Sequence, residues 1–115
     1  MNEEKGISKL ANEFRECQKI LTAIGDENRQ YMIIEMMQMG NCNGVRVGEI
    51  TEKTHLSRPA VSHHLQILKD AGILNVRKEG TKNYYFFDSD MNAIKRLIKA
   101  LHMSVDIMSD LPKRN

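Results

Sequence analysis

The chain has 115 residues, of which 41% are hydrophobic and 28% are charged, and its formal net charge is only +2. This composition is typical of one folded domain over residues 1–115 and excludes a disordered chain. Because no apolar run approaches the roughly 20 residues of a membrane span and the first residues lack a signal-peptide core, we expect a cytoplasmic protein without membrane contact.

Residues 6–24 are predicted to form a first helix with one narrow apolar stripe. Its apolar side chains recur at intervals of 3, 4, 3, 4 and 3 residues, which is the a/d spacing of a coiled coil. They are Ile7, Leu10, Phe14, Cys17, Leu21 and Ile24. On such a stripe, Cys17 is expected to act as a small buried hydrophobic residue.

A second helix is predicted from Asp26 to Met39, with Asp26 as its N-cap. This helix is apolar around much of its surface, which predicts a central position in the core. Its apolar residues are Tyr31, Met32, Ile33, Ile34, Met36, Met37 and Met39. A methionine-lined copper site is an alternative, but filling gaps in a core is the far more common role of methionine. After the loop 40–44, residues 45–47 are expected to add a short third strand beside the hairpin that follows later.

A short helix over residues 48–55 and a longer helix over residues 57–71 are predicted to form a helix-turn-helix. Ser57 is suited to cap the longer helix, Pro59 is tolerated in its first turn, and Gly72 ends it. The inward face of this helix carries an apolar stripe at positions i, i+4 and i+7, formed by Val61, Leu65 and Leu68.

The outward face of helix 57–71 is polar and fits the major groove of DNA, which is about 12 Å wide. Arg58 is expected to contact guanine or a phosphate, and Gln66 to contact adenine. The predicted DNA contacts of this helix are Ser57, Arg58, Ala60, Ser62, His63 and Gln66. Taken alone, the stretch is also compatible with an ordinary solvated surface helix.

A β-hairpin is predicted next, with strands at residues 73–77 and 84–87 and a tight turn at Gly80, which can adopt a positive φ. A basic wing of this kind beside a recognition helix contacts the DNA backbone without reading its sequence. The predicted contacts within wing 77–84 are Arg77, Lys78, Thr81 and Lys82. The alternative is a solvated hairpin whose charges keep an edge strand from aggregating.

Positive charge is concentrated in this part of the chain. Residues 58–83 carry five basic and two acidic side chains, whereas the whole chain has a net charge of only +2, so the remainder is slightly acidic. A basic stretch within a nearly neutral chain is the electrostatic footprint expected of a DNA-binding face.

Residues 89–109 are predicted to form a last helix with the same apolar spacing, at Met91, Ile94, Ile98, Leu101, Val105 and Met108. Because one small domain cannot easily cover two such stripes, we expect helices 6–24 and 89–109 to pack on each other and on a second subunit. The predicted dimer interface comprises Ile7, Leu10, Phe14, Cys17, Leu21, Ile94, Ile98, Leu101, Val105 and Met108. A two-fold dimer would place two recognition helices roughly 34 Å apart, to read a palindromic site in double-stranded DNA. The alternative is that both stripes belong to the core of one chain.

Together these elements predict a mainly α fold with a small β-wing (α+β), namely a winged helix-turn-helix of five helices with a two- or three-stranded antiparallel sheet. The predicted function is sequence-specific DNA binding that regulates transcription. No nucleophile–base pair, phosphate loop or metal triad occurs in the sequence, so we expect neither an enzyme nor a cofactor. A winged helix that contacts proteins instead of DNA is a second interpretation, which the polar outward face argues against.

The chain resembles the ArsR/SmtB family of bacterial winged-helix repressors between about Leu21 and Phe87. The matching residues are Ile24-Gly25-Asp26 with Arg29, Val61-Ser62-His63-His64-Leu65, Leu68, Ala71-Gly72-Ile73-Leu74, and Arg77, Gly80, Tyr84 and Tyr85, whereas Glu27-Asn28 departs from the Pro-Thr of many members. The resemblance implies a homodimer that represses an operon, with helix 57–71 in the major groove and wing 77–84 on the flanking DNA.

The resemblance also implies where a metal sensor would lie, and its usual ligands are missing. The family's Cys-x-Cys pair corresponds to Arg46 and Gly48, which cannot bind a soft metal. The Asp and His pairs on the last helix correspond to Asp90, Asn92, Met103 and Asp106, which include no histidine. We therefore expect no metal site.

The cysteines leave one further alternative, a thiol- or metal-responsive repressor that uses Cys17 and Cys42. Cys42 lies in a Gly/Asn loop and is the better candidate for a reactive thiol. His63 and His64 lie roughly 100° apart on their helix and are poorly placed to share a metal. We expect His64 to pack beside the core helix.

Overall fold

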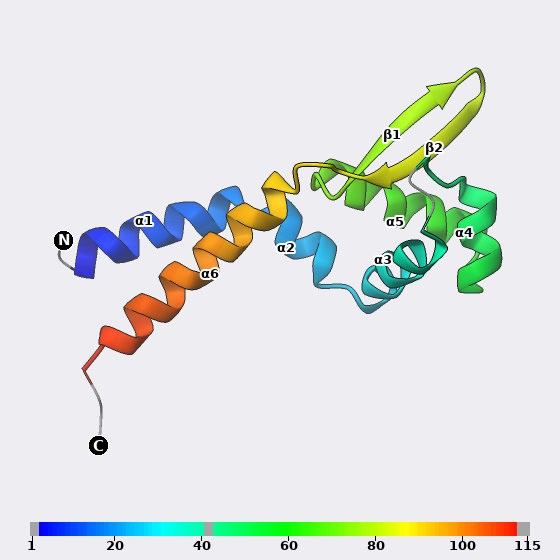
Figure 1. Ribbon diagram of the computed structural model, residues 1–115. Coiled ribbons are helices and arrows are strands. Elements are labelled where there is room, and N and C mark those ends of the chain that lie inside the picture. The colour runs from blue at the N-terminus through cyan, green and yellow to red at the C-terminus, as the bar shows by residue number, and fades with distance from the viewer. Residues whose placement is uncertain (1–2, 41–42, 113–115) are drawn as a thin grey trace.

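Six helices and one β-hairpin make up the described part of the chain, residues 3–40 and 43–112 of a computed structural model (Figure 1). In chain order they are α1 (Glu3–Glu16), α2 (Gln18–Ile24), α3 (Glu27–Met39), α4 (Val47–Thr54), α5 (Arg58–Asp70), β1 (Leu74–Glu79), β2 (Lys82–Phe87) and α6 (Asn92–Asp110). The two strands form an antiparallel sheet. The expected mainly α fold with a small β-wing is therefore confirmed, and α4, α5 and the hairpin form a winged helix-turn-helix.

The first predicted helix is divided in two, which gives six helices where five were expected. The break lies at Cys17, whose N–H is shared between the carbonyl oxygens of Glu13 (3.0 Å) and Phe14 (3.1 Å), and α2 begins at the next residue. The residues of α2 that are buried are Ile20 and Ala23, and they lie with Cys17 in the core of their own chain. The apolar stripe predicted for one straight helix over residues 6–24 is therefore interrupted at Cys17 and does not run on along α2.

The hydrophobic core lies between the helices of the winged-helix body and the start of the hairpin. Ile50 of α4, Leu65 and Leu68 of α5, and Leu74 of β1 are fully buried. Burying one such side chain contributes about 1.5–3 kcal/mol through the hydrophobic effect. These contacts confirm the predicted inward stripe of α5 and set the position of its opposite, outward face.

α3 is not the central core helix that its composition predicted. Met32 and Met36 face the core, whereas Tyr31, Ile34 and Met37 are 37%, 51% and 60% exposed. The neighbouring helices α2 and α4 cover only one side of α3, which lies at the surface of the winged-helix body (Figure 1). Its second apolar side therefore forms an exposed row.

α1 and α6 lie side by side and project away from the winged-helix body as an arm (Figure 1). Nε of Arg96 on α6 pairs with Oε2 of Glu13 on α1 at 3.1 Å. The arm makes the chain long, with extents of 56 × 29 × 22 Å and a radius of gyration of 17.7 Å, against about 13 Å for a compact domain of this length. No helix in the described part of the chain combines the length and apolar character needed to cross a membrane.

The apolar stripe of α6 is not covered by the rest of the described chain. Leu97, Ala100 and Ser104 are the buried residues of α6. On another side of the helix lie the exposed residues Ile98 (49%), Leu101 (46%), Val105 (59%) and Met108 (66%). Of the other predicted interface residues, Ile7 is exposed, Leu10, Phe14, Leu21 and Ile94 are partly buried, and Cys17 is buried within its own chain.

Candidate nucleic-acid interface

The turn between α4 and α5 is short and held by local hydrogen bonds. His55 follows α4 in the left-handed conformation (φ 60°), and the buried hydroxyl oxygen of Thr54 accepts from the N–H of Leu56 at 3.4 Å. Ser57 then caps α5, its Oγ accepting from the N–H of Ala60 at 3.3 Å. The predicted helix-turn-helix and its Ser57 cap are thus both observed.

Most of the predicted contact residues in and just before α5 are exposed to solvent. Ser57, Arg58, Ser62, His63 and Gln66 are exposed, and Ala60 is partly buried. Nε2 of Gln66 donates to Oδ1 of Asp70, one turn later, at 2.9 Å. This hydrogen bond orients the Gln66 amide and leaves its oxygen and second N–H available for a base edge. Asp70 was not predicted to take part, although its i, i+4 spacing from Gln66 is the signal for such a pair.

The wing closes through a two-residue turn. β1 and β2 pair up to Glu79 and Lys82, and Gly80 has the positive φ (63°) that the sequence predicted. The expected third strand is reduced to one β-bridge, in which Val45 and Tyr85 exchange two backbone hydrogen bonds of 2.8 Å. This bridge joins the wing to the segment that leads into α4.

The basic residues of the wing differ in their surroundings. Nε of Arg77 lies 3.1 Å from Oε1 of Glu79, and the Arg77 guanidinium is 4.9 Å from the centre of the Tyr84 ring. Lys78 and Lys82 are exposed, and the ion pairs found within the described residues include neither of them. The two lysines are therefore better placed than Arg77 to contact a phosphate.

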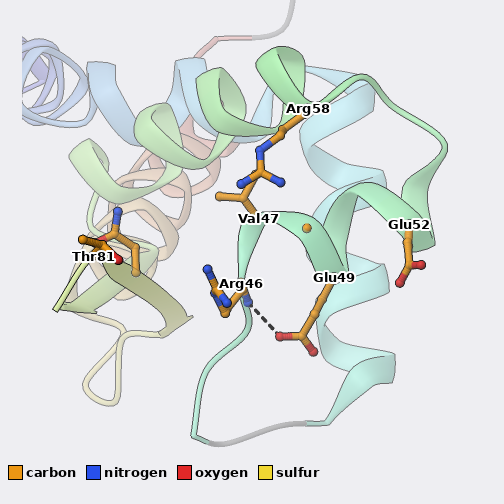
Figure 2. Close-up of a pocket in the computed structure, with 8 residues that line it drawn as sticks. Arg46, Val47, Glu49, Glu52, Arg58 and Thr81 are labelled. Carbon is orange, nitrogen blue, oxygen red and sulfur yellow. Dashed lines mark hydrogen bonds between the residues drawn. The ribbon is translucent and has the colours of Figure 1, made fainter. Parts of the chain in front are cut away.

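A cleft of about 540 Å³ separates the wing from the start of the helix-turn-helix (Figure 2). Its lining residues are Arg46, Val47, Gly48, Glu49, Glu52, Arg58, Thr81 and Asn83. The Arg58 guanidinium lies against the first turn of α4, since a Cβ on Gly48 would be 3.7 Å from its Nη1. Figure 2 shows Arg46 and Arg58 reaching into the same cleft, with Thr81 of the wing across from them. Two guanidinium groups in this arrangement are suited to bind phosphate oxygens.

Arg46 was not predicted as a DNA contact. It precedes α4, is exposed, and its own N–H donates to Oε1 of Glu49 at 3.1 Å. The signal in the sequence was a basic residue beside the first turn of a helix, where unpaired N–H groups also attract anions. Glu49 and Glu52 line the same cleft and limit its positive potential.

A buried arginine ties α5 to the helices behind it. Arg29 of α3 donates from Nε to the carbonyl oxygen of Ala23 (2.8 Å) and from Nη2 to that of Thr22 (2.9 Å). Its Nη1 lies 3.1 Å from Nδ1 of His64 on α5. Because a guanidinium has no acceptor, Nδ1 must accept, which makes His64 the neutral Nε2–H tautomer. Asp26 caps α3 by accepting from the Arg29 N–H at 3.1 Å, so one network joins α2, α3 and α5.

The charge states in this network follow from its surroundings. Burial lowers the pKa of His64, an effect that Asp26 opposes and Arg29 reinforces. The hydrogen bond from the Arg29 N–H lowers the pKa of Asp26. Neutral His64 and ionised Asp26 are therefore the forms that hold α5 in place.

Acidification is expected to destabilise the protein through His64. Because the pKa of folded His64 lies below the ordinary value of 6.5, its contribution to the free energy of unfolding is complete above pH 6.5 and declines as the pH falls below that value. In His64→Asn, an amide oxygen can accept from Arg29 without titrating, so the decline between pH 7 and pH 5 should shrink. Asp26, whose pKa lies below 3.8, loses its contribution only at lower pH.

Urea denaturation at a series of pH values measures this decline. His55→Asn is the matched control, because His55 is exposed, lies outside the Arg29–His64 network and has a left-handed conformation that asparagine tolerates, and this variant should keep the wild-type pH dependence. If the free energy of unfolding of His64→Asn falls between pH 7 and pH 5 as steeply as that of the wild type, protonation of His64 is not the cause of the acid destabilisation.

The thiol and metal alternatives gain no support from the described residues. No three His, Cys, Asp or Glu side chains among them lie close enough to hold a metal ion. Cys17 is buried, and Cys42 lies outside the described residues. The rings of His63 and His64 are 5.7 Å apart, but Nδ1 of His64 is already bonded to Arg29. A switch between Cys17 and Cys42 therefore stays a prediction.

Residues 30–76 match a family model described as the bacterial regulatory protein, arsR family. The HTH-type transcriptional regulator MJ1325 of Methanocaldococcus jannaschii is 35% identical over 86 residues, which are 75% of this chain and 91% of that protein. The transcriptional repressor SdpR of Bacillus subtilis is 33% identical over 66 residues, which are 57% of this chain and 69% of that protein. The solved structure of HlyU from Vibrio cholerae is 33% identical, with a TM-score of 0.52 over 73% of this chain and 85% of that chain.

Proposed function

Because the chain belongs to the ArsR family of bacterial regulatory proteins, we propose that it is a homodimeric repressor that reads a palindromic site in double-stranded DNA. Family membership makes it a DNA-binding transcriptional regulator with a winged helix-turn-helix, and not an enzyme. A regulator of this kind acts on the chromosome, so we place it in the cytoplasm. The observation that carries the proposal is the exposed polar face of α5 beside two exposed wing lysines.

The contacts divide by what each side chain can recognise. Ser62, His63 and Gln66 stand on the outward face of α5 and are assigned to base edges in the major groove. Arg58 is assigned to a phosphate, because its guanidinium lies in the cleft beside the wing together with Arg46. Such phosphate contacts fix the register of the helix on DNA, and the α5 contacts then supply sequence preference.

The wing is assigned to the backbone of the flanking DNA. Lys78 and Lys82 supply the charge, while Arg77 is engaged with Glu79 and Tyr84. Thr81 lies at the tip, facing the same cleft as Arg58. These contacts would raise affinity for every sequence alike, since they touch no base.

The dimer is proposed from the exposed stripe of α6. Removing four large apolar side chains from water would stabilise a dimer by about 25 cal/mol for each Å² of apolar surface covered. In a two-fold pair, the same stripe from each chain covers the other, because such an interface is self-complementary. Repression is proposed because SdpR is named a repressor. The relative HlyU is named an activator, so activation is the opposite outcome that a transcription assay would reveal. An operator overlapped by the dimer would block transcription.

Two alanine variants test the division into base and backbone contacts. Gln66→Ala should weaken binding to the preferred duplex by about 1–3 kcal/mol and reduce the preference between duplexes. Lys82→Ala should weaken binding to all duplexes alike and lower the slope of log affinity against log salt by about 1, because one phosphate is no longer neutralised. Fluorescence anisotropy over a salt series, on a duplex selected from a random pool, measures both effects.

Lys99→Ala is the matched control, because it removes the same charge from the arm and should leave the slope unchanged. The assignment of α5 fails if Gln66→Ala weakens every duplex equally. The assignment of the wing fails if Lys82→Ala keeps the wild-type slope.

A further inference from the structure

A second cleft, of about 400 Å³, lies between the end of α3 and the base of the wing. Met36, Met37 and Gly40 form one wall. Val45 and the three consecutive aromatic residues of β2, Tyr85, Phe86 and Phe87, form the other. This wing-base cleft is separate from the cleft that holds Arg46 and Arg58, since the two share no lining residue.

We infer that the wing-base cleft binds a small, neutral, apolar molecule of about the size of two or three aromatic rings. Its volume falls within the roughly 300–1,000 Å³ of small-molecule sites, and its lining is mainly apolar, since it comes from methionine, glycine, valine and aromatic residues. No charged side chain lines it among the described residues, so a charged ligand would lose its hydration without gaining a partner. Met36 and Met37 have flexible thioethers that can adapt to an aromatic ligand.

The ligand would contact both sides of the joint that positions the wing. Val45 is buried, and its two 2.8 Å backbone hydrogen bonds to Tyr85 are the link between the wing and the segment before α4. The joint is also close-packed next to the bridge, where a Cβ on Gly44 would lie 3.0 Å from Cβ of Tyr84. A ligand that prefers one position of the wing would shift the population toward that position. Binding in the cleft should therefore change the affinity for DNA, a step that rests on the proposed function.

The neutral fluorescent amine N-phenyl-1-naphthylamine is the probe for the cleft. Its fluorescence should rise on titration with the folded protein and saturate at one probe per chain. Met37→Glu places a carboxylate at the cleft and should weaken probe binding at least tenfold. Ile34→Glu is the matched control, because Ile34 is similarly exposed on the same helix but does not line the cleft. Urea denaturation confirms that both variants are folded.

The same titration is then repeated in the presence of DNA. Saturating probe should change DNA affinity at least threefold in the wild type and in Ile34→Glu, but not in Met37→Glu. Binding of the probe in the absence of DNA tests the cleft, and binding of DNA in the absence of the probe tests the proposed function. Failure of the cleft and failure of the proposed function can therefore be told apart. Unsaturable fluorescence, or equally weakened probe binding in both variants, would overturn the site. Saturable uptake with unchanged DNA affinity would overturn its link to the wing.

Discussion

Replacing Arg29 with methionine is expected to lower the free energy of unfolding by about 3–5 kcal/mol. Arg29 is only 7% exposed, and its guanidinium donates to the carbonyl oxygens of Ala23 and Thr22 and to Nδ1 of His64. Methionine fills a similar volume but donates no hydrogen bond, so three acceptors lose their partner. A buried acceptor without a partner costs about 1–3 kcal/mol.

Urea denaturation at one fixed protein concentration measures the effect. Arg29→Lys should recover little of the stability, because one ammonium group cannot reproduce the fork that spans α2 and α5. Arg96→Met is the control, since it removes an arginine from an exposed ion pair, and such pairs contribute little. If the midpoint of Arg29→Met matches that of Arg96→Met, the network does not hold α5 as described.

Two glutamates on the stripe of α6 are expected to abolish the dimer and most of the DNA affinity. The double variant Leu101→Glu with Val105→Glu puts two carboxylates at positions that are 46% and 59% exposed in one chain, so each chain should still fold. In a two-fold interface four carboxylates would face one another without partners. Without the second recognition helix, affinity for the full site should fall roughly 10²- to 10⁴-fold.

Sedimentation equilibrium and anisotropy on the same samples test this prediction together. Lys99→Glu, which introduces a carboxylate on a different side of α6, should remain dimeric and keep its affinity for DNA within a few fold. A double variant that stays dimeric would show that the stripe is not the interface. A monomeric variant with wild-type affinity would show that DNA binding does not need the pair.

The helix-turn-helix was predictable from sequence because its determinants are local. The cap at Ser57 needs only an N–H three residues later, and the wing turn needs only a residue that tolerates positive φ at Gly80. The inward stripe of α5 follows from helical periodicity alone. Each of these features depends on a short run of neighbouring residues.

Features that depend on distant contacts were missed. No glycine or proline marks the break at Cys17, which arises where α1 leaves the body to pack along α6. Composition placed all of α3 in the core, although a helix covered on one side leaves Tyr31, Ile34 and Met37 exposed. The pairing of Arg29 with His64 joins residues 35 positions apart, a separation that no local pattern reports.

The candidate site was also predicted only in part: the sequence indicated the exposed residues of α5 but not how the arginines lie around the cleft. Most of the predicted contact residues of α5 are exposed, as expected from the apolar stripe on the opposite side, but the position of Arg58 against Gly48 depends on how α4 and α5 pack. Arg46 lines the same cleft as Arg58, with Thr81 of the wing across from them. The proposed division between base and phosphate contacts therefore rests on the structure as well as on the sequence.

Selection of bound duplexes from a random-sequence pool determines whether two chains together read a palindromic site. We predict that the wild-type protein enriches an inverted repeat whose half-site centres lie about 10 base pairs apart, one turn of DNA, with two chains on each duplex. Enrichment of a single half-site bound by one chain, or no enrichment by the folded protein, would contradict it.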